Sequence, residues 1–333
     1  MLERREAFRD ALVCWFGRHG KDYPWRQTRD PYAVLVSELM LQQTQIATVL
    51  GKGYYTGFLA AFPDAESLAA ADDERLLKAW EGLGYYRRAR MLRETARAVI
   101  ARHGGVFPQE LAELLELPGL GRYTAGALRA FAFELPAVVV DGNVARVLAR
   151  LMDFAAPVDD AAGQRRLWAW AEELADPQRP RVFHSALMEL GQTVCRPGEP
   201  DCARCPVAEF CRAAEPARLP VKRQAPAITA VTEHALWCRD AGGRLLLHCE
   251  DGKRRTGLWK LPTREAAELA KLPIVARQRY AITRYRVDLM VHLGGADQAP
   301  RGTAEQWLPV AAVARLPMPA PFRKVVERLL EES

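Results

Sequence analysis

The stretch "LAELLELPGLGRYTAGALRAFAF", residues 111–133, has the pattern of two helices joined by a tight turn. Pro118 cannot continue the first helix, because its ring removes a backbone N–H, and Gly119 and Gly121 allow the chain to turn sharply. Backbone N–H groups exposed at the start of the second helix form a site for a phosphate and contact DNA without reading its sequence. A lone G-x-G is weak evidence, but the complete stretch predicts a two-helix hairpin.

The rest of the chain divides into a helical part and a smaller mixed part. Residues 4–214 have the apolar spacing of helices joined by short loops, and strand-like alternation is scarce there. The stretch "ARLPVKRQAPAITA" is basic, poorly periodic and flanked by prolines, as linkers are. Beyond it, "EHALWCRD", "GRLLLHCE" and "YRVDLMVHLGG" predict strands, the first two joined by a hairpin at "AGG". We therefore expect an all-α domain at 1–216, a linker at 217–228 and an α+β domain at 229–333.

Composition and charge limit the function classes. The chain has 333 residues, which is enough for two domains with cores of their own, and only seven cysteines, so a secreted disulfide scaffold is not expected. The start "MLERREAFRD" has no apolar signal core, and no run of about 18 apolar residues occurs. The net charge of +6 suits a polyanionic partner. We expect a soluble cytoplasmic protein, nucleoid-associated if bacterial, with no membrane segment.

Four of the seven cysteines lie within seventeen residues, in "CRPGEPDCARCPVAEFC". Cys195, Cys202, Cys205 and Cys211 have the spacing C-x6-C-x2-C-x5-C. Four thiolates can bind either tetrahedral zinc or a [4Fe–4S] cluster. Zinc ribbons usually have two close C-x2-C pairs, so the asymmetric spacing favours the cluster over zinc, and unliganded thiols remain the third alternative.

Two of these stretches resemble one known family. The cysteine spacing is similar to the iron–sulfur loop of the endonuclease III and MutY group of DNA glycosylases, and "LPGLGRYTAGAL" closely resembles their helix–hairpin–helix. The resemblance implies an all-α glycosylase domain with a [4Fe–4S] loop. In that group the cluster lies away from the chemistry and shapes a DNA-contacting loop. Arg196, Arg204 and Arg212 could then contact phosphates, the alternative being solvated charges.

The second helix of the hairpin bears on the reaction type. Bifunctional members of the group have a lysine there, which attacks the sugar C1′ and leads to strand cleavage. Tyr123 occupies that position in this chain. The resemblance therefore implies base removal by water alone.

Two carboxylates are expected to carry the chemistry, because glycosidases pair a protonated acid with a carboxylate that stabilises the developing cation. Asp141 follows an apolar run in "AVVVDGNVARVLARL" and precedes a predicted helix, so it could simply be an N-cap. The segment "VDGNVARVL" nevertheless matches the family's catalytic aspartate segment. The match implies that Asp141 faces the sugar, with Asn143 as its hydrogen-bond neighbour.

Glu38 is the second acid. It lies in "VSELMLQQT", inside an apolar helical pattern, where burial would raise the pKa of a carboxyl towards that of a general acid; an exposed helix position is the alternative. The longer stretch "PWRQTRDPYAVLVSELMLQQT" resembles the MutY branch, and endonuclease III types have a different residue at this position. The resemblance implies that Glu38 protonates N7 of an extruded adenine, while Asp141 stabilises the sugar cation and Tyr123 positions the acid.

The same resemblance implies a set of DNA contacts. Trp25 and Arg26 would lie near the pocket for the extruded base, with core packing as the alternative for Trp25. Three residues resemble those that wedge into the vacated base stack, namely Gln43, Leu83 and Tyr85, and two would lie against the opposing strand, namely Gln42 and Thr44.

The C-terminal region departs from the family in part. "TGLWKLP", residues 256–262, is similar to the opening strand of the MutT-like domain of MutY proteins, which recognises 8-oxoguanine, but the Nudix box with its magnesium-binding acids is absent. Ile282-Thr283-Arg284 stands where MutY proteins usually have Phe-Ser-His, at the tip between two strands. Thr283 replaces the serine and keeps a hydroxyl that could bond the oxidised purine. In "FHSALMELG", His184 and Ser185 stand where the family has Asn followed by Gln or Glu.

The sequence therefore predicts a monofunctional adenine DNA glycosylase of base excision repair. Its expected partner is double-stranded DNA with adenine opposite 8-oxoguanine or guanine. We expect a monomer, and family members are associated with replication clamps. Two alternatives stay open: a glycosylase with another mismatch or damaged-base target, and a non-catalytic protein that binds DNA damage.

Overall fold

The computed structural model describes residues 4–224, 226–252, 255–295 and 298–332. The chain forms two compact units. The first consists of Met1–Gln42, Asp64–Glu66 and Glu94–Gln224, and the second of Gln43–Pro63, Ser67–Arg93 and Ala225–Ser333. Two helical segments before residue 94 thus belong to the same unit as the C-terminal sheets.

The first unit is helical. Its elements are α1 (Arg5–His19), α2 (Pro24–Gln27), α3 (Pro31–Leu41), α9 (Leu111–Glu116), α10 (Arg122–Ala127), a π-helical turn (Leu128–Ala132), α11 (Gly142–Leu151), α12 (Ala161–Leu174), α13 (Pro180–Thr193) and the 3-10 turns Cys202–Arg204, Ala208–Phe210 and Pro216–Arg218. Among the described residues, no helix is long and apolar enough to cross a membrane.

The core of this unit forms between α1, α11, α12 and α13. Phe8 of α1 meets the rings of Phe183 and Phe210 edge-to-face, at centroid distances of 6.4 and 5.7 Å. Val144 and Leu148, four residues apart on α11, are completely buried in the same cluster. This apolar spacing is what places the start of α11, and with it Asp141, at a fixed position.

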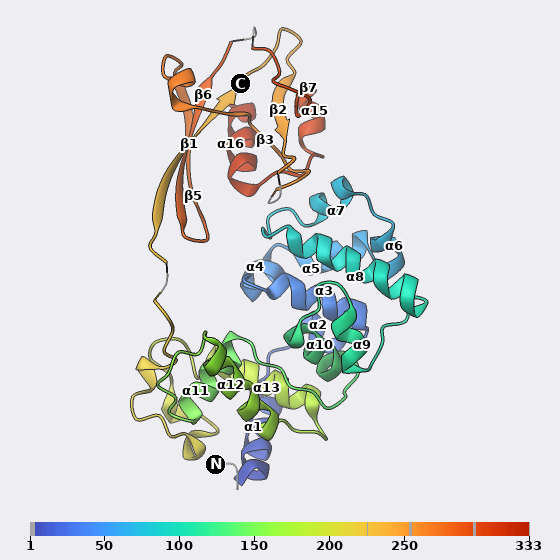
Figure 1. Cartoon of the computed structure of the whole chain (residues 1–333), viewed down its shortest axis with the longest axis vertical. Helices are drawn as coiled ribbons and strands as arrows, with labels where there is room; N and C mark the ends of the chain where they lie inside the picture. Colours follow the sequence, from blue (N-terminus) through green and yellow to red (C-terminus); the bar gives the residue numbers. More distant parts are fainter. Residues whose placement is uncertain (1–3, 225, 253–254, 296–297, 333) are drawn as a thin grey trace. The chain divides into compact units, whose positions relative to one another are not determined.

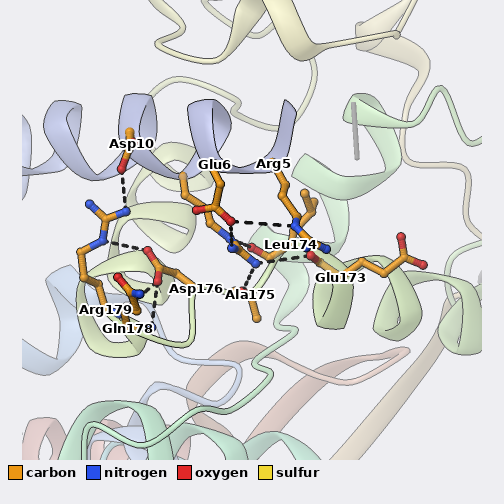
Figure 2. A network of polar contacts seen from close by, with 10 residues as sticks. Arg5, Glu6, Asp10, Glu173, Leu174, Ala175, Asp176, Gln178 and Arg179 are labelled. Atoms are coloured by element: carbon orange, nitrogen blue, oxygen red, sulfur yellow. Dashed lines mark hydrogen bonds and ion pairs between the residues drawn. The ribbon is translucent and has the colours of Figure 1, made fainter. Parts of the chain in front are cut away.

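Polar contacts hold α1 against the segment between α12 and α13 (Figure 2). The buried Arg9 side chain donates to the carbonyl oxygens of Leu174, at 2.9 Å, and Ala175, which end α12. Arg179 donates to Asp10, at 2.7 Å, and to Asp176, at 2.8 Å. Since the last carbonyls of a helix have no partner within it, Arg9 satisfies those at the end of α12. Arg179 stabilises the same junction through its ion pairs with Asp10 and Asp176.

The second unit begins with helices. They are α4 (Ile46–Gly51), α5 (Tyr54–Ala61) and α7 (Asp73–Ala79), while α6 (Ala65–Ala69) and α8 (Arg87–His103) have residues in both units. The helical pattern over residues 31–50 is interrupted between α3 and α4, where Gln43 has a left-handed backbone with φ of 58°. That conformation is incompatible with a continuing right-handed helix.

The C-terminal region of this unit contains two sheets with three helices (Figure 1). Its elements are β1 (Thr229–Trp237), β2 (Leu245–Cys249), β3 (Trp259–Lys260), β4 (Thr263–Arg264), α14 (Ala266–Leu269), β5 (Ile274–Ile282), β6 (Tyr285–Leu293), β7 (Glu305–Leu308), α15 (Val310–Val313) and α16 (Ala320–Glu331). The strand orders are β4-β1-β6-β5 and β3-β2-β7.

The expected strands form, but the first two do not pair as a full hairpin. Strand β1 runs parallel to β6, and β2 pairs with β3 and β7 in the other sheet. At the turn, Arg239 and Leu245 form an isolated antiparallel bridge, and the backbone N–H groups of Asp240 and Leu246 donate to the carbonyls of Arg244 and Cys238, at 3.0 and 3.1 Å. The predicted hairpin turn therefore forms, but it is short, because the longer pairing with β6 places β1 in a different sheet from β2. Strands β5 and β6 form the long hairpin of this region instead (Figure 1).

Candidate active site

Helix α3 carries Glu38 into the interior. The Asp30 carboxylate caps the helix by accepting from the backbone N–H groups of Tyr32, at 3.0 Å, and Ala33, at 3.3 Å, and Pro31 occupies the first position. Every side chain of 32–40 is buried, and Glu38 is 7% exposed. The exposed-helix alternative for Glu38 is therefore wrong.

The Glu38 carboxyl meets Tyr123 of α10. The Tyr123 hydroxyl donates to Glu38 Oε2 at 2.7 Å. Burial raises the pKa of Glu38 to about 7; the bond from Tyr123 lowers it and the charge of Asp141 raises it further. Burial also raises the pKa of Tyr123, so this hydroxyl stays a donor. A carboxyl that is half-protonated near neutral pH is suited to general-acid catalysis.

Asp141 caps α11 and also belongs to this site. Its Oδ1 accepts from the backbone N–H of Val144 at 2.7 Å, and its Oδ2 accepts from Asn143 Nδ2 at 2.9 Å. Burial raises the pKa of Asp141, and these two bonds oppose the rise because they favour the ionised form. The N-cap alternative is thus correct. Asp141 also acts on Glu38, because its charge raises the pKa of that carboxyl.

Asn143 is itself held in place. Arg146, one turn along α11, donates to Asn143 Oδ1 at 2.9 Å, to the carbonyl of Gly191 at 2.7 Å and to the carbonyl of Cys195 at 2.8 Å. A Cβ on Gly191 would lie 2.7 Å from the Cβ of Asn143. Helix α13 can therefore approach the carboxylate pair this closely only with glycine at that position.

Trp25 and Arg26 lie on the short helix α2, packed against α1 and α13. The Trp25 ring is buried and stacks on Tyr23 at a centroid distance of 5.2 Å, so core packing does account for part of its role. Arg26 pairs with the completely buried Glu189 at 2.8 Å and lies over the rings of Phe16 and Tyr23. The arginine is therefore fixed in one orientation by charge and by aromatic contact.

Helix α13 presents three polar side chains to the interior, namely those of His184, Ser185 and Glu189. His184 Nε2 lies 2.9 Å from the Ala137 carbonyl, so it carries the proton, and burial lowers the pKa of His184 to about 4. Glu189 Oε2 pairs with Arg26, whereas Glu189 Oε1 and His184 Nδ1 have no hydrogen-bond partner among the described residues. Two buried acceptors thus remain on this helix.

The helix–hairpin–helix turn forms as expected between α9 and α10. Gly119 has a φ of 83°, which favours glycine, and Gly121 is the N-cap residue of α10. The Thr95 hydroxyl donates to the Pro118 carbonyl at 2.6 Å and fixes the turn to α8. The N–H groups at the start of α10 are consequently held in a constant place.

The four clustered cysteines follow α13 in one loop. Burial raises the pKa of the Cys205 thiol to about 11, and the charges of Cys195, Cys211 and Cys202 raise it further. Arg150 links two of them, because its Nη1 lies 3.3 Å from Cys195 Sγ and its carbonyl accepts from Cys211 Sγ at 3.5 Å. Across the described part of the chain, no three His, Cys, Asp or Glu side chains form a ligand group for a metal ion. Four mutually influencing thiols beside a cation are donors of the type that an iron–sulfur cluster takes.

The residues expected to wedge into DNA, namely Gln43, Leu83 and Tyr85, lie in the second unit. Of the two expected against the opposing strand, Thr44 lies in the second unit and Gln42, the C-cap residue of α3, in the first. Tyr85 is 47% exposed and has a left-handed φ of 47°, while Leu83 is buried. The buried Arg88 side chain donates to the Leu83 carbonyl at 3.0 Å and to Thr44 Oγ1 at 3.3 Å. Its guanidinium also lies over the Tyr85 ring, and burial lowers the pKa of Arg88 to about 10. Arg88 therefore joins the turn at Thr44 to the turn at Tyr85.

Thr283 lies at the two-residue turn between β5 and β6. Its φ is 49°, its side chain is exposed, and its hydroxyl donates to the Ile282 carbonyl at 2.7 Å. A β-branched residue in the left-handed region stores about 1–3 kcal/mol of strain. The turn thus presents an exposed hydroxyl at a constrained backbone position.

Comparisons with known proteins identify the family of this chain. The family model of the HhH-GPD superfamily of base excision DNA repair proteins matches residues 36–172, the range that contains Glu38, Tyr123 and Asp141. The solved structure of a thermostable thymine-DNA glycosylase is 31% identical, with a TM-score of 0.57, over 63% of this chain and 95% of that chain. This chain belongs to the HhH-GPD superfamily.

Curated members of the superfamily are also similar in sequence. The adenine DNA glycosylase of Homo sapiens is 47% identical over 216 residues, which cover 62% of this chain and 39% of that protein. The adenine DNA glycosylase of Mus musculus is 46% identical, over 62% of this chain and 42% of that protein. The chain therefore spans about two fifths of the length of these relatives. Its first part has the helical glycosylase fold of the superfamily, followed by an α+β region of two sheets.

Three supporting residues were not predicted from the sequence. Glu189 is an acid inside an apolar helical pattern, the signal that identified Glu38, and could have been found in the same way. Arg88 and Arg146 are single members of arginine-rich stretches, and nothing in the local pattern distinguishes them from solvated charges. Their roles become evident only from the contacts they make.

Proposed function

We propose that this protein is a monofunctional adenine DNA glycosylase, which hydrolyses the N-glycosidic bond of adenine paired with 8-oxoguanine or guanine. The observation that carries the proposal is the pair of carboxyl groups of Glu38 and Asp141 with the Tyr123 hydroxyl bonded to the first. The similarity to adenine DNA glycosylases of mammals supports the choice of base.

In this proposal the two carboxyl groups have different tasks. Protonated Glu38 donates its proton to N7 of the extruded adenine. The electron pair of the breaking N-glycosidic bond then passes into the positively charged ring, which leaves as neutral adenine. Ionised Asp141 stabilises the positive charge that develops on the sugar. A water molecule then adds to C1′, and its proton returns to a carboxylate of the pair. The different environments of the two acids, one held by Tyr123 and one by Asn143 and a backbone N–H, support this division.

Tyr123 supports hydrolysis without strand cleavage. A lyase needs an amine to form a Schiff base with C1′. The side chain of Tyr123 is a phenol whose pKa is raised by burial, and it is engaged with Glu38. The product is therefore an abasic site in an intact strand.

The resident cofactor in this proposal is a [4Fe–4S] cluster. Cys195, Cys202, Cys205 and Cys211 would hold it, and when bound it supplies structural order to the loop rather than chemistry at the base. The contacts of Arg150 with two of these thiols and the bond from Arg146 to the Cys195 carbonyl support a structural role.

The DNA contacts follow from the same reading. The turn at Gly119 and Gly121 would bind a phosphate, and Trp25 and Arg26 would border the base pocket. Gln43, Leu83 and Tyr85 would enter the base stack, while Gln42 and Thr44 would face the opposing strand. Thr283 would contact the base opposite adenine. It would do so as part of a MutT-like lesion-recognition domain at 229–333, which follows a helical domain at 1–216 and a linker at 217–228. The protein would act as a monomer and could contact a replication clamp.

A second target deserves the same test, because Ser185 and Arg284 differ from the residues expected and a thymine-DNA glycosylase is among the similar structures. A panel of duplexes with adenine or thymine opposite 8-oxoguanine, guanine, cytosine or thymine tests both targets. We expect free adenine from the 8-oxoguanine and guanine pairs and strand breaks only after alkali. Thymine release would support the second target, breaks without alkali would exclude monofunctional chemistry, and tight binding without any base release would favour a damage-binding protein.

A further inference from the structure

The turn that carries Tyr85 is flanked by two hydrogen bonds to the C-terminal region of the same unit. Glu81, directly before the turn, accepts from Arg323 Nε of α16 at 2.8 Å. Tyr86, directly after it, donates its hydroxyl to the carbonyl of Met318 at 3.3 Å. The four residues of the turn, 82–85, therefore lie between two contacts with one short segment of the C-terminal region.

The backbone of this turn has little freedom. Gly82, Gly84 and Tyr85 all have a positive φ, of 93, 67 and 47°. A Cβ on Gly82 would lie 2.0 Å from the hydroxyl oxygen of Tyr54, and the Trp80 indole donates to the Gly84 carbonyl at 3.1 Å. Because the backbone of residues 82–85 is held this tightly, it cannot absorb a displacement of one end by small adjustments. A displacement at Glu81 or Tyr86 therefore also moves Tyr85.

Arg323 is a rigid anchor for one end. Besides Glu81 it donates to the carbonyl of Val313, at 2.9 Å, and to that of Leu316. Its side chain is 12% exposed and that of Glu81 is 15% exposed, so the pair is only slightly screened by solvent. A third residue, Glu327, lies 3.9 Å from Arg323 on α16 but is mostly exposed.

The anchor connects directly to the sheet that holds Thr283. Helix α16 packs against β5, and Phe322, Val325 and Val326 of α16 are buried in the core of the C-terminal region. Strand β5 ends at Ile282, next to Thr283. A further bond, from Arg90 of α8 to the Thr256 carbonyl, reinforces the attachment of α8 to this region.

We propose that Arg323 and the carbonyl of Met318 position the turn 82–85. Through these two contacts, binding of the base opposite the target by the C-terminal region is coupled to insertion of Tyr85 into the base stack. This rests on the proposed function, since it takes Tyr85 as a wedge and Thr283 as a lesion contact. Arg323, Glu81 and Tyr86 are positioning residues that touch neither the base nor the sugar.

The test uses the full chain and three variants. Glu81→Gln removes the charge that pairs with Arg323 and with Lys78, while keeping the shape of the side chain. Tyr86→Phe removes the bond to Met318. Glu327→Gln is the matched control, because it removes the other acid near Arg323 without reaching the turn. Extrusion is measured as the fluorescence rise of 2-aminopurine placed opposite 8-oxoguanine or guanine at saturating protein, base release by single-turnover kinetics, and folding by urea unfolding.

We expect Glu81→Gln and Tyr86→Phe each to lower the equilibrium constant for extrusion opposite 8-oxoguanine by about two- to thirtyfold, the range that altered coupling gives. The ratio of this constant to the one measured opposite guanine should also fall. Glu327→Gln should match wild type. Wild-type fluorescence in both variants, or an equal loss in Glu327→Gln, would overturn the coupling. Wild-type protein that releases no base from any duplex would refute the proposed function instead, and the fluorescence measurement would still decide the coupling.

Discussion

Replacing Tyr123 by Phe tests how the general acid is tuned. The substitution keeps the ring and removes the hydroxyl that donates to Glu38 Oε2 at 2.7 Å. That bond lowers the pKa of Glu38, because it stabilises the ionised carboxylate. Its loss therefore raises the pKa, and the acid keeps its proton to higher pH.

The magnitude follows from the strength of the bond. A hydrogen bond to a charged group contributes about 1.5–3 kcal/mol, and about 1.4 kcal/mol corresponds to one pKa unit. The rate of base release in wild type should fall as pH rises through about 7, where Glu38 loses its proton. In Tyr123→Phe this fall should move up by about one to two pH units.

The assay is single-turnover release of adenine from a duplex with adenine opposite 8-oxoguanine, measured from pH 5 to 10 with excess protein. Tyr280→Phe is the matched control, because the Tyr280 hydroxyl donates to a glutamate, Glu233, at the same distance of 2.7 Å in the second unit. Its pH profile should equal that of wild type. A profile of Tyr123→Phe that stays in place or moves to lower pH would refute the assigned roles of both residues.

Three further substitutions test the surroundings of the site. Arg88→Met should lower the free energy of unfolding by about 1–3 kcal/mol through lost hydrogen bonds and weaken duplex binding, measured by urea unfolding and anisotropy, with exposed Arg87→Met unchanged. Gly191→Ala should slow base release more than it weakens binding, because its Cβ would lie 2.7 Å from that of Asn143 and displace it; wild-type kinetics would contradict this. Cys202→Ala should lower bound iron and cost folding or DNA binding, whereas loss of chemistry alone would show that the loop has a different role.

The two-helix hairpin and the carboxylate pair could be predicted because their signals are local. Pro118 and the glycines after it specify a turn wherever they occur, and the structure has the turn at that place. Glu38 lies in a run of apolar residues that has no exposed face, so its burial follows from the sequence around it. Asp141 caps α11, as its position before a predicted helix indicates.

The pairing of the strands could not be predicted in the same way. Strand β1 pairs with β6, more than fifty residues later, and the turn at "AGG" is too short a signal to decide against that partner. The supporting arginines were missed for a related reason. Arg88 binds the hydroxyl of Thr44 and Arg146 the carbonyl of Cys195, and these partners lie far away in the sequence, where nothing marks them.

The central claim is that Glu38 protonates adenine while Asp141 stabilises the sugar cation. It is tested most directly by free adenine released in a single turnover from a duplex with adenine opposite 8-oxoguanine, comparing wild type with Glu38→Gln. General-acid catalysis contributes about 10²- to 10⁴-fold, so we expect release by wild type and a loss of at least that size in Glu38→Gln, with duplex binding retained. Equal rates of adenine release in the two proteins would contradict the claim.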